Sequence, residues 1–194
     1  MPPDTKTSKF LSLVLRHKPD AIGLKLDAFG WADIADLIAK ARQAGVILTP
    51  AKITQIVAAS DKRRFAISDD GNRIRANQGH SVAVDLGLPR TEPPEFLYHG
   101  TAQRSLTAIR NNGIQPMMRT LVHLSQDRTT AIEVGRRHGS PVVLKIHAGQ
   151  MRRDGFTFQR SENGVWLIEH VPLKYIEHYC IARSSRGTQC PSMK

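Results

Sequence analysis

The sequence predicts an α+β protein organised as two lobes. The first third of the chain carries three amphipathic helical segments followed by a hairpin pattern, and the second half alternates short apolar strands with short helices. Between them, Asp85–Glu95 holds three prolines and a glycine and has no helical periodicity. That composition is typical of a linker, so we expect domains at 1–84 and 96–183 and a polar tail at 184–194.

Three helices are expected in the first lobe. The first, at 9–17, has one apolar face and ends before Pro19, because a residue that precedes proline is pushed out of the helical region. The second begins at Asp33, whose carboxylate can cap it, and ends at Gly45. The third begins at Thr49-Pro50, a capping hydroxyl followed by proline in the first turn.

A β-hairpin closes the first lobe. Two strand-like segments, 64–68 and 73–76, flank the turn sequence Asp69-Asp70-Gly71-Asn72, and a brief strand is also expected at 24–27. Three helices followed by a hairpin is the order of the winged-helix fold, which usually binds nucleic acid through its third helix and its wing. Basic residues occupy that helix and the hairpin region: Lys52, Lys62, Arg63, Arg64, Arg73 and Arg75.

The second lobe is expected to combine strands with two helices. The strands are expected at 96–98, 122–125, 141–147, 156–159, 165–169 and 175–182. One helix contains Leu106 and Ile109 and ends at Gly113. The other begins at Asp127, which can cap it, and runs to about Arg137.

Positive charge is the strongest feature of the composition. The net charge is +11, with five excess basic residues in 1–90 and six in 91–194. A field spread over both halves attracts polyanions, so RNA or DNA is the first partner to expect and a phosphorylated small molecule the second. The alternative is that the positive charge has no specific partner, because many soluble proteins are simply basic.

Several kinds of protein are disfavoured. No apolar run approaches the ~20 residues of a membrane span, and the first residues lack the apolar core of a secretion signal. Cys180 and Cys190 are the only cysteines, which fits neither a disulfide scaffold nor a zinc site and indicates a reducing, cytoplasmic setting. No metal-binding spacing and no glycine-rich nucleotide loop of the common types occurs, so no metal is expected.

Two groups of polar residues could bind a phosphorylated ligand. Phe96-Leu97-Tyr98 is expected to end a strand that runs into His99-Gly100-Thr101, which would place an imidazole and an uncovered backbone at the rim of a sheet. The alternative is a strand that simply stops at a turn. Arginines are the second group, since several guanidiniums converging on one point would hold a phosphomonoester.

Six motifs in order resemble the RNA 2'-phosphotransferase family over about residues 8–178. They are Leu15-Arg16-His17-Lys18-Pro19, Lys62-Arg63-Arg64-Phe65, Ile74–Ser81, Tyr98-His99-Gly100-Thr101, Arg119 before Val122-His123-Leu124-Ser125, and Asn163-Gly164-Val165-Trp166-Leu167. The resemblance implies an N-terminal winged-helix lobe for RNA. It also implies a C-terminal ADP-ribosyltransferase-like lobe, built on a split β-sheet, for NAD.

The family's reaction has two steps. An internal 2'-phosphate of RNA, at a tRNA splice junction, attacks the nicotinamide ribose of NAD and expels nicotinamide. The ribose 2''-hydroxyl then attacks the phosphorus, which leaves a 2'-hydroxyl on the RNA and releases ADP-ribose 1'',2''-cyclic phosphate. The resemblance therefore implies a transferase that consumes NAD, uses no metal and acts on tRNA-like RNA. A monomer is expected, since no heptad pattern is present.

The resemblance also implies the site residues. Catalysis falls to Arg16, His17, Arg64 and Arg119. The arginines would hold the phosphate and stabilise its developing charge, and His17 would carry a proton at the 2'-oxygen. NAD would be bound by His99, Gly100, Thr101, His123, Ser125 and Val165.

Some neighbouring positions keep two interpretations. Gln78, His80 and Ser81 either line the phosphate site or order the junction of the lobes. The segment 136–138 either reaches the NAD pyrophosphate or is a charge cluster at a helix end. Val165 stands where many ADP-ribosyltransferases carry a glutamate that activates an acceptor hydroxyl, which argues against transfer to protein side chains.

Two other functions fit the same sequence. One is ADP-ribosylation of a terminal phosphate of RNA or DNA that stops after the first step. The other is a non-catalytic winged-helix regulator that binds nucleic acid and senses a nucleotide.

Overall fold

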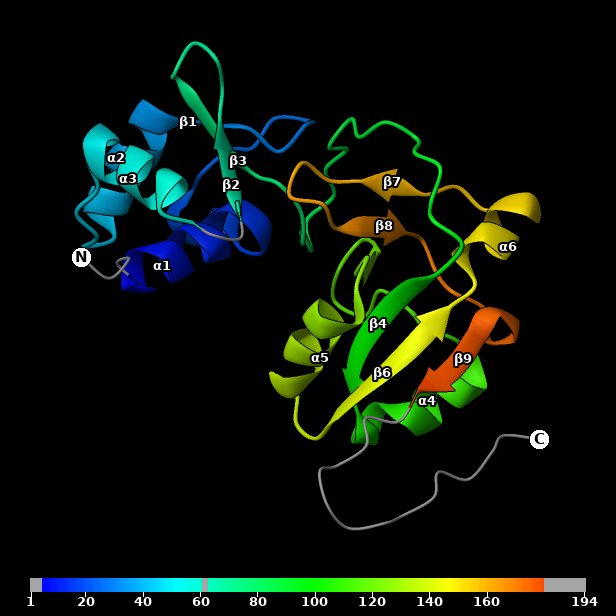
Figure 1. Ribbon diagram of the computed structural model, residues 1–194. Helices are drawn as coiled ribbons and strands as arrows, with labels where there is room; N and C mark the ends of the chain where they lie inside the picture. Colours follow the sequence, from blue (N-terminus) through cyan, green and yellow to red (C-terminus); the bar gives the residue numbers. More distant parts are fainter. Residues whose placement is uncertain (1–4, 61–62, 180–194) are drawn as a thin grey trace. The chain divides into compact units, whose positions relative to one another are not determined.

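The computed structural model describes residues 5–60 and 63–179 (Figure 1). Its contacts divide the chain into two compact units. Unit 1 consists of Met1–Pro89, Pro116–Leu121 and Arg160–Val165, and unit 2 consists of Arg90–Gln115, Val122–Gln159 and Trp166–Lys194. Two short segments from the second half of the chain therefore fold with the first. The predicted tail, both cysteines, Lys62 and the end of the last predicted strand lie outside the described residues.

Unit 1 packs three α-helices on a small antiparallel sheet (Figure 1). In chain order its elements are α1 (Thr5–Arg16), the 3-10 helix η1 (Pro19–Ile22), β1 (Ala32–Asp33), α2 (Ile34–Gln43), α3 (Pro50–Ala58), β2 (Phe65–Ile67) and β3 (Arg73–Ala76). The sheet has the order β1-β3-β2. Its core is aliphatic, with Leu11, Leu15, Leu37, Ile53 and Ile74 completely buried.

The helix ends of unit 1 confirm the predicted caps. The carboxylate of Asp33 accepts a hydrogen bond from the Asp36 amide at 2.8 Å. The Thr49 hydroxyl accepts one from the Lys52 amide at 3.1 Å, with Pro50 in the first turn of α3. Each side-chain oxygen satisfies an amide that the helix leaves without a partner, which fixes where α2 and α3 begin.

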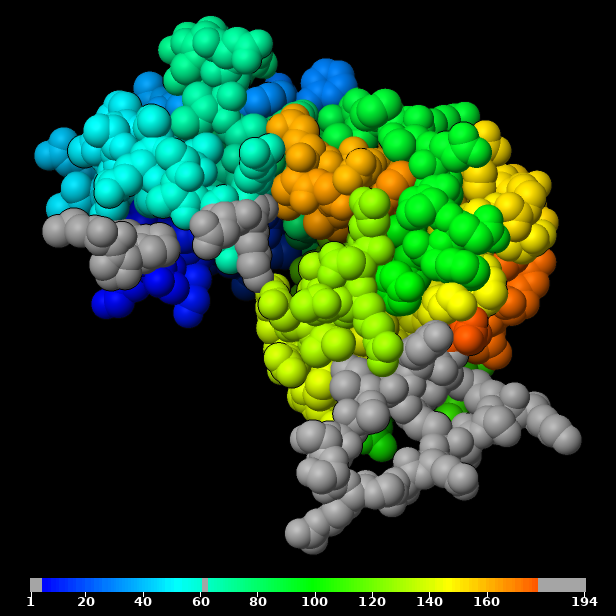
Figure 2. Space-filling model, viewed as in Figure 1, coloured from blue at the N-terminus to red at the C-terminus, as the bar shows by residue number. Residues whose placement is uncertain are grey.

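The predicted hairpin is also present. β2 and β3 pair antiparallel with Phe65 opposite Ala76, and Gly71 takes a φ of 73° in the turn between them. The tip of this hairpin projects from the surface of unit 1 (Figure 2). The predicted strand at 24–27 is wrong: these residues form a loop, in which buried Leu24 packs into the core and produces the alternating pattern.

Unit 2 contains two three-stranded antiparallel sheets, so the described chain has the predicted α+β architecture. One sheet has the order β4-β6-β9 and the other β5-β8-β7. The strands are β4 (Leu97–Ala102), β5 (Val122–Leu124), β6 (Pro141–Ile146), β7 (Gln159–Arg160), β8 (Trp166–Ile168) and β9 (Ile176–Tyr179). The helices are η2 (Gln103–Ser105), α4 (Leu106–Asn112), α5 (Arg128–Arg136), α6 (Ala148–Arg153) and η3 (Leu173–Tyr175).

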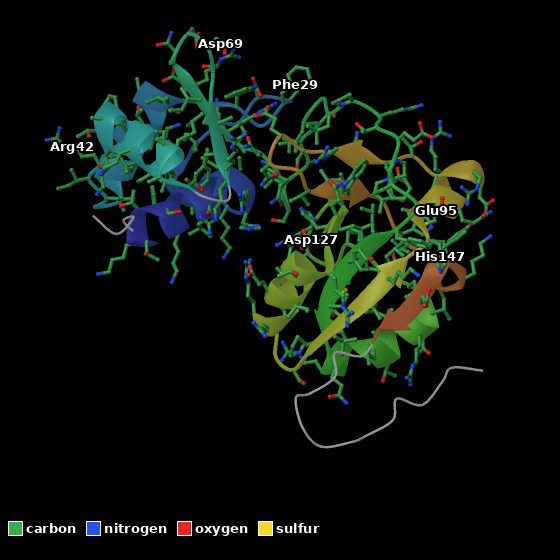
Figure 3. All side chains as sticks on the ribbon, viewed as in Figure 1. Phe29, Arg42, Asp69, Glu95, Asp127 and His147 are labelled. Atoms are coloured by element: carbon green, nitrogen blue, oxygen red, sulfur yellow. The ribbon has the colours of Figure 1, made fainter. Side chains whose placement is uncertain are left out.

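Helix α5 begins at the predicted cap. Asp127 accepts a hydrogen bond from the Thr130 amide at 2.8 Å, and its side chain lies at the start of the helix (Figure 3). Gly113, with a φ of 70°, ends α4 as predicted. Helix α6 was not predicted, and the strand expected at 156–159 is reduced to Gln159 and Arg160.

Strand β4 is longer than predicted. It does not end at Tyr98 but continues through His99-Gly100-Thr101, which pair with Leu144, Val143 and Val142 of β6. Gly100 is covered by α5: a Cβ at Gly100 would lie 1.8 Å from the carbonyl oxygen of Ala131. The glycine is therefore needed for close packing of α5 on β4, and it does not mark the end of the strand.

Replacing Gly100 by alanine should destabilise unit 2 by about 3 kcal/mol or more, because α5 must move away from β4. Urea denaturation measures this change. Gly23→Ala is the control: nothing lies within 4 Å of its Cβ and its φ of 65° adds only backbone strain. That variant should lose about 1 kcal/mol. Equal losses in the two variants would contradict the packing role of Gly100.

Candidate active site

The C-terminal end of α1 presents Arg16 and His17. The buried face of this helix, Leu11, Val14 and Leu15, anchors it in the core of unit 1. The carbonyl of Arg16 accepts hydrogen bonds from the amides of Ser81 at 2.9 Å and Val82 at 3.3 Å. A last-turn carbonyl that the helix leaves unpaired is thereby satisfied, and residues 81–82 are fixed against the end of α1.

The guanidinium of Arg16 lies against the start of β2. Its Nη2 donates to the carbonyl of Arg64 at 3.2 Å, and its Cζ lies 5.7 Å from the centre of the Phe65 ring. Gly79 lies alongside with a φ of 90°, and a Cβ there would stand 3.7 Å from Nη1 of Arg16. These contacts hold the long side chain in one place, so less conformational entropy is lost when a ligand binds.

Arg16 feels the positive charges of two other arginines, Arg119 and Arg64. Burial, then Arg119, then Arg64 lower the pKa of Arg16 to about 10. Arg16 therefore remains charged at neutral pH although like charges surround it. Such mutual repulsion is relieved by an anion placed among the side chains, and planar guanidiniums match the oxygens of a phosphate.

His17 stands beside the arginines. Its Nδ1 and the Ser81 hydroxyl are hydrogen bonded at 3.0 Å, and that hydroxyl lies 3.4 Å from the carbonyl of Arg16. A hydroxyl that donates to the carbonyl accepts from Nδ1–H, which leaves the lone pair of the imidazole on Nε2. Burial, Arg16 and Arg119 lower the pKa of His17, so the ring is neutral at pH 7.

Arg119 lies in a short segment, 116–121, that folds with unit 1. Elements of unit 2 precede and follow this segment in sequence. The Thr120 amide donates to the carbonyl of His80 at 3.0 Å, and the Arg119 amide donates to the carbonyl of Pro116 at 3.1 Å. The backbone of His80 thus holds the segment that carries Arg119.

His80 and Ser81 contact both segments of the candidate site, the end of α1 and residues 116–121. His80 is 2% exposed, and burial followed by the charges of Arg16, His17 and Arg75 lowers its pKa to about 4. These contacts order the backbone within unit 1, and Gly79 gave a local sequence signal for the turn, because a positive φ before His80 turns the chain toward α1. Both predicted roles of Gln78, His80 and Ser81, lining the phosphate site or ordering the junction of the lobes, stay predictions.

In unit 2, four of the six residues predicted for NAD come together where the two sheets meet. His99 Nδ1 and the carbonyl of His123 lie 3.1 Å apart. Ser125 and Tyr98 exchange backbone hydrogen bonds of 2.9 and 2.7 Å, which form an isolated bridge between β4 and the end of β5. Gly100 follows this bridge. Because backbone groups alternate along a strand, its N–H and C=O point away from β6, on the side of Ser125.

The other two predicted residues lie differently. Thr101 is buried in β4, opposite Val142. Val165 belongs to unit 1, in a turn where its carbonyl accepts from the Ser161 amide at 2.9 Å and hydroxyl at 3.0 Å. The exposed segment 136–138 lies at the C-terminal end of α5, where cations are favoured by the helix dipole.

Among the described residues, no cluster of three His, Cys, Asp or Glu side chains is arranged to hold a metal ion. Within the same part of the chain, no helix has the length and hydropathy to cross a membrane.

Stability should fall between pH 7 and pH 5 by about 2 kcal/mol, because His80 has a pKa of about 4 when folded and ~6.5 when unfolded. The folded state favours the neutral ring, so its contribution is complete above pH 6.5 and is lost as protons bind the unfolded chain. Urea denaturation at both pH values measures the change. A His80→Gln variant should lose most of this pH dependence, and an unaltered slope would contradict the assignment.

Comparison with known proteins identifies the family. A sequence profile of the RNA 2'-phosphotransferase, Tpt1 / KptA family matches residues 2–170. A protein of Agrobacterium fabrum named probable RNA 2'-phosphotransferase is 59% identical over 172 residues, 89% of this chain and 92% of that protein. Proteins with the same name from Burkholderia pseudomallei and Streptomyces coelicolor are 55% and 54% identical, over 89% and 88% of this chain and 94% and 93% of their own lengths.

The matched region contains all six motifs on which the predicted resemblance rests, and the resemblance is confirmed. The relatives are matched over nearly their whole lengths, so the similarity extends to both units. The chain therefore belongs to the RNA 2'-phosphotransferase, Tpt1 / KptA family, and is an enzyme of the transferase class.

Proposed function

We propose that this enzyme removes an internal 2'-phosphate from RNA in an NAD-dependent reaction of two steps. The first transfers ADP-ribose to the 2'-phosphate with release of nicotinamide, and the second is a transesterification that gives 2'-hydroxyl RNA and ADP-ribose 1'',2''-cyclic phosphate. The observation that carries the proposal is the electrostatic coupling of buried Arg16 to Arg119 and Arg64: burial and these two charges lower the pKa of Arg16, and such a group of guanidiniums suits a phosphomonoester.

The arginines hold and neutralise the phosphate. A 2'-phosphate is already a nucleophile, so it needs positioning rather than a base to activate it. Arg16 is fixed by the Arg64 carbonyl and by Phe65, and such preorganised donors stabilise charge as it develops on the phosphorus oxygens.

His17 moves the proton of the second step. Its Nδ1 is bound by the Ser81 hydroxyl, which leaves Nε2 to accept a proton from the attacking hydroxyl or to return one to the departing 2'-oxygen. The side chain is neutral at pH 7 because burial and Arg16 lower its pKa, so it starts the cycle as a base.

Unit 2 offers groups that fit NAD. When bound, NAD supplies an electrophilic anomeric carbon with a neutral leaving group. The outward N–H and C=O of Gly100 are complementary to a primary carboxamide such as that of nicotinamide, and His99 is held beside them by the His123 carbonyl. We assign Thr101 and Ser125 to the same ligand by their positions in the family's motifs.

The two units support the proposed roles of the lobes. The order α1-β1-α2-α3-β2-β3 with a β1-β3-β2 sheet supports a winged helix, and on that ground we assign unit 1 to RNA. The two sheets of unit 2, joined at the Tyr98–Ser125 bridge, support an ADP-ribosyltransferase-like split sheet. A tRNA-like substrate, a monomeric enzyme and a cytoplasmic location belong to this proposal.

Product analysis tests the reaction. The enzyme, NAD and an RNA oligonucleotide with one internal 2'-phosphate should yield nicotinamide, 2'-hydroxyl RNA and ADP-ribose 1'',2''-cyclic phosphate in equal amounts. A stable ADP-ribosylated terminal phosphate on RNA or DNA would support the first-step-only alternative instead. RNA binding without release of nicotinamide would support a non-catalytic regulator.

Alanine at Arg16, Arg64 or Arg119 should each lower the rate of cyclic phosphate release by about 100-fold or more, because an electrostatic contact to the transition state is lost. Quenched-flow measurement of both products separates the two steps. Arg42→Ala, at an exposed position near the end of α2, is the matched control and should leave the rate unchanged (Figure 3). Loss of activity in the control as well, or none in the three variants, would contradict the assignment.

A further inference from the structure

A hollow of about 480 Å³ opens on the surface of unit 1, beside the arginine cluster. It lies where α3 ends and β2 begins, and the 160–165 segment closes one side. Its lining consists of Val57, Ala58, Ser60, Arg63, Phe65, Ala66, Asn77 and Glu162. The volume is in the lower part of the range of small-molecule sites and suits one nucleoside rather than a longer chain.

Asn77 gives this hollow a directed hydrogen-bonding group. The side chain is 5% exposed, and its Nδ2 donates to the carbonyl of Arg63 at 2.7 Å. With Nδ2 engaged, the amide orientation is fixed, and the buried Oδ1 finds no donor among the residues that the structure describes. Because Asn77 lines the hollow, an N–H group of a ligand could satisfy this acceptor after a small shift of the side chains that cover it.

Arg64 links the hollow to the proposed phosphate site. Its carbonyl accepts from the Asn77 amide at 3.0 Å and from Nη2 of Arg16 at 3.2 Å. The neighbours of Arg64 on either side, Arg63 and Phe65, both line the hollow. Arg64, which belongs to the proposed phosphate site, therefore lies in sequence between two residues that line the hollow. A phosphate bound by Arg64 and a group bound in the hollow would contact neighbouring residues of the same chain segment.

The lining favours a base over a second phosphate. Val57, Ala58 and Ala66 offer apolar surface to a flat ring. Glu162 adds a carboxylate, paired with Arg75 at 2.8 Å, that would repel an anion but can accept from a ring N–H. Every nucleobase presents a polar N–H edge and an apolar face, which is the combination that these groups match.

We propose that this hollow, which we name the Asn77 pocket, binds the base of the RNA nucleotide that carries the 2'-phosphate or of its immediate neighbour. The base donates an N–H to Oδ1 of Asn77 and rests on the apolar wall. This inference rests on the proposed function and adds to it a nucleobase subsite that positions the phosphate. A sugar-phosphate lacking its base should accordingly bind less tightly.

Abasic substrates test the pocket directly. An RNA oligonucleotide with one internal 2'-phosphate is compared with three versions that lack the base at the phosphorylated nucleotide or at either neighbour. Binding is measured by fluorescence anisotropy without NAD, so no turnover is needed. Loss of the base at one of these positions should weaken binding about tenfold, and loss at the other two should have little effect.

Filling the pocket should abolish this difference. Ala58→Trp places an indole in the hollow from an exposed position of α3, so the core is not disturbed. It should weaken binding of intact RNA about tenfold and make the critical abasic RNA bind no worse than the intact one. Ala39→Trp, at an exposed position of α2 outside the pocket, is the matched control and should behave like the unsubstituted enzyme.

The outcomes separate this inference from the proposed function. If the unsubstituted enzyme binds intact RNA and all three abasic RNAs equally well while it still releases nicotinamide with intact RNA, the Asn77 pocket is not a base site although the reaction stands. If Ala58→Trp retains the full difference between intact and abasic RNA, the base is bound elsewhere and the inference is overturned. If no nicotinamide is released from any substrate, the proposed function itself fails.

Discussion

Backbone hydrogen bonds of residues 80–82 are the interaction on which the candidate active site depends. The amides of Ser81 and Val82 bind the last carbonyl of α1, and the carbonyl of His80 binds the Thr120 amide. One short segment therefore fixes Arg16 and His17 on one side and the loop of Arg119 on the other. The proposed catalytic groups, which come from distant parts of the sequence, are held by main-chain contacts, which a change of side chain does not directly remove.

Two glycines in the predicted motifs have different structural roles. Gly79 takes a φ of 90°, a backbone conformation that L side chains rarely adopt, where the chain turns into His80. Gly100 lets α5 lie directly on β4, the strand that carries His99, because a Cβ there would clash with the carbonyl oxygen of Ala131. The first glycine is explained by backbone conformation and the second by packing, and neither role depends on a ligand.

Local signals predicted much of the fold. The caps at Asp33, Thr49 and Asp127 were recognised because a side-chain oxygen before an apolar periodic segment has one favourable use. The end of β4 was predicted wrongly, because Gly100 resembles a strand breaker until α5 is known to cover it. Alternating leucines in 24–27 likewise resembled a strand, whereas the pattern comes from a loop in which Leu24 is buried and Leu26 is half-buried.

The site was harder to predict because its members meet only through tertiary contacts. No local pattern shows that residues 116–121 fold with unit 1, since this follows from the hydrogen bond between Thr120 and His80. The unsatisfied oxygen of Asn77 is equally invisible in the sequence, because it depends on where Arg63 turns its carbonyl. The family motifs predicted Arg16, Arg64 and Arg119 as site residues. The hydrogen bonds of residues 80–82 explain how the segments that carry Arg16 and Arg119 are held together.

The depressed pKa of His17 would couple substrate binding to proton uptake in the proposed mechanism. Burial is the largest cause of the depression and the charges of Arg16 and Arg119 add to it, so an anion bound beside these arginines would cancel the part that they contribute. The imidazole would then become more basic when a phosphate binds, and it could take up the proton that a departing 2'-oxygen needs. By thermodynamic linkage, such an enzyme would bind a phosphorylated RNA more tightly in mildly acidic solution than its dephosphorylated product.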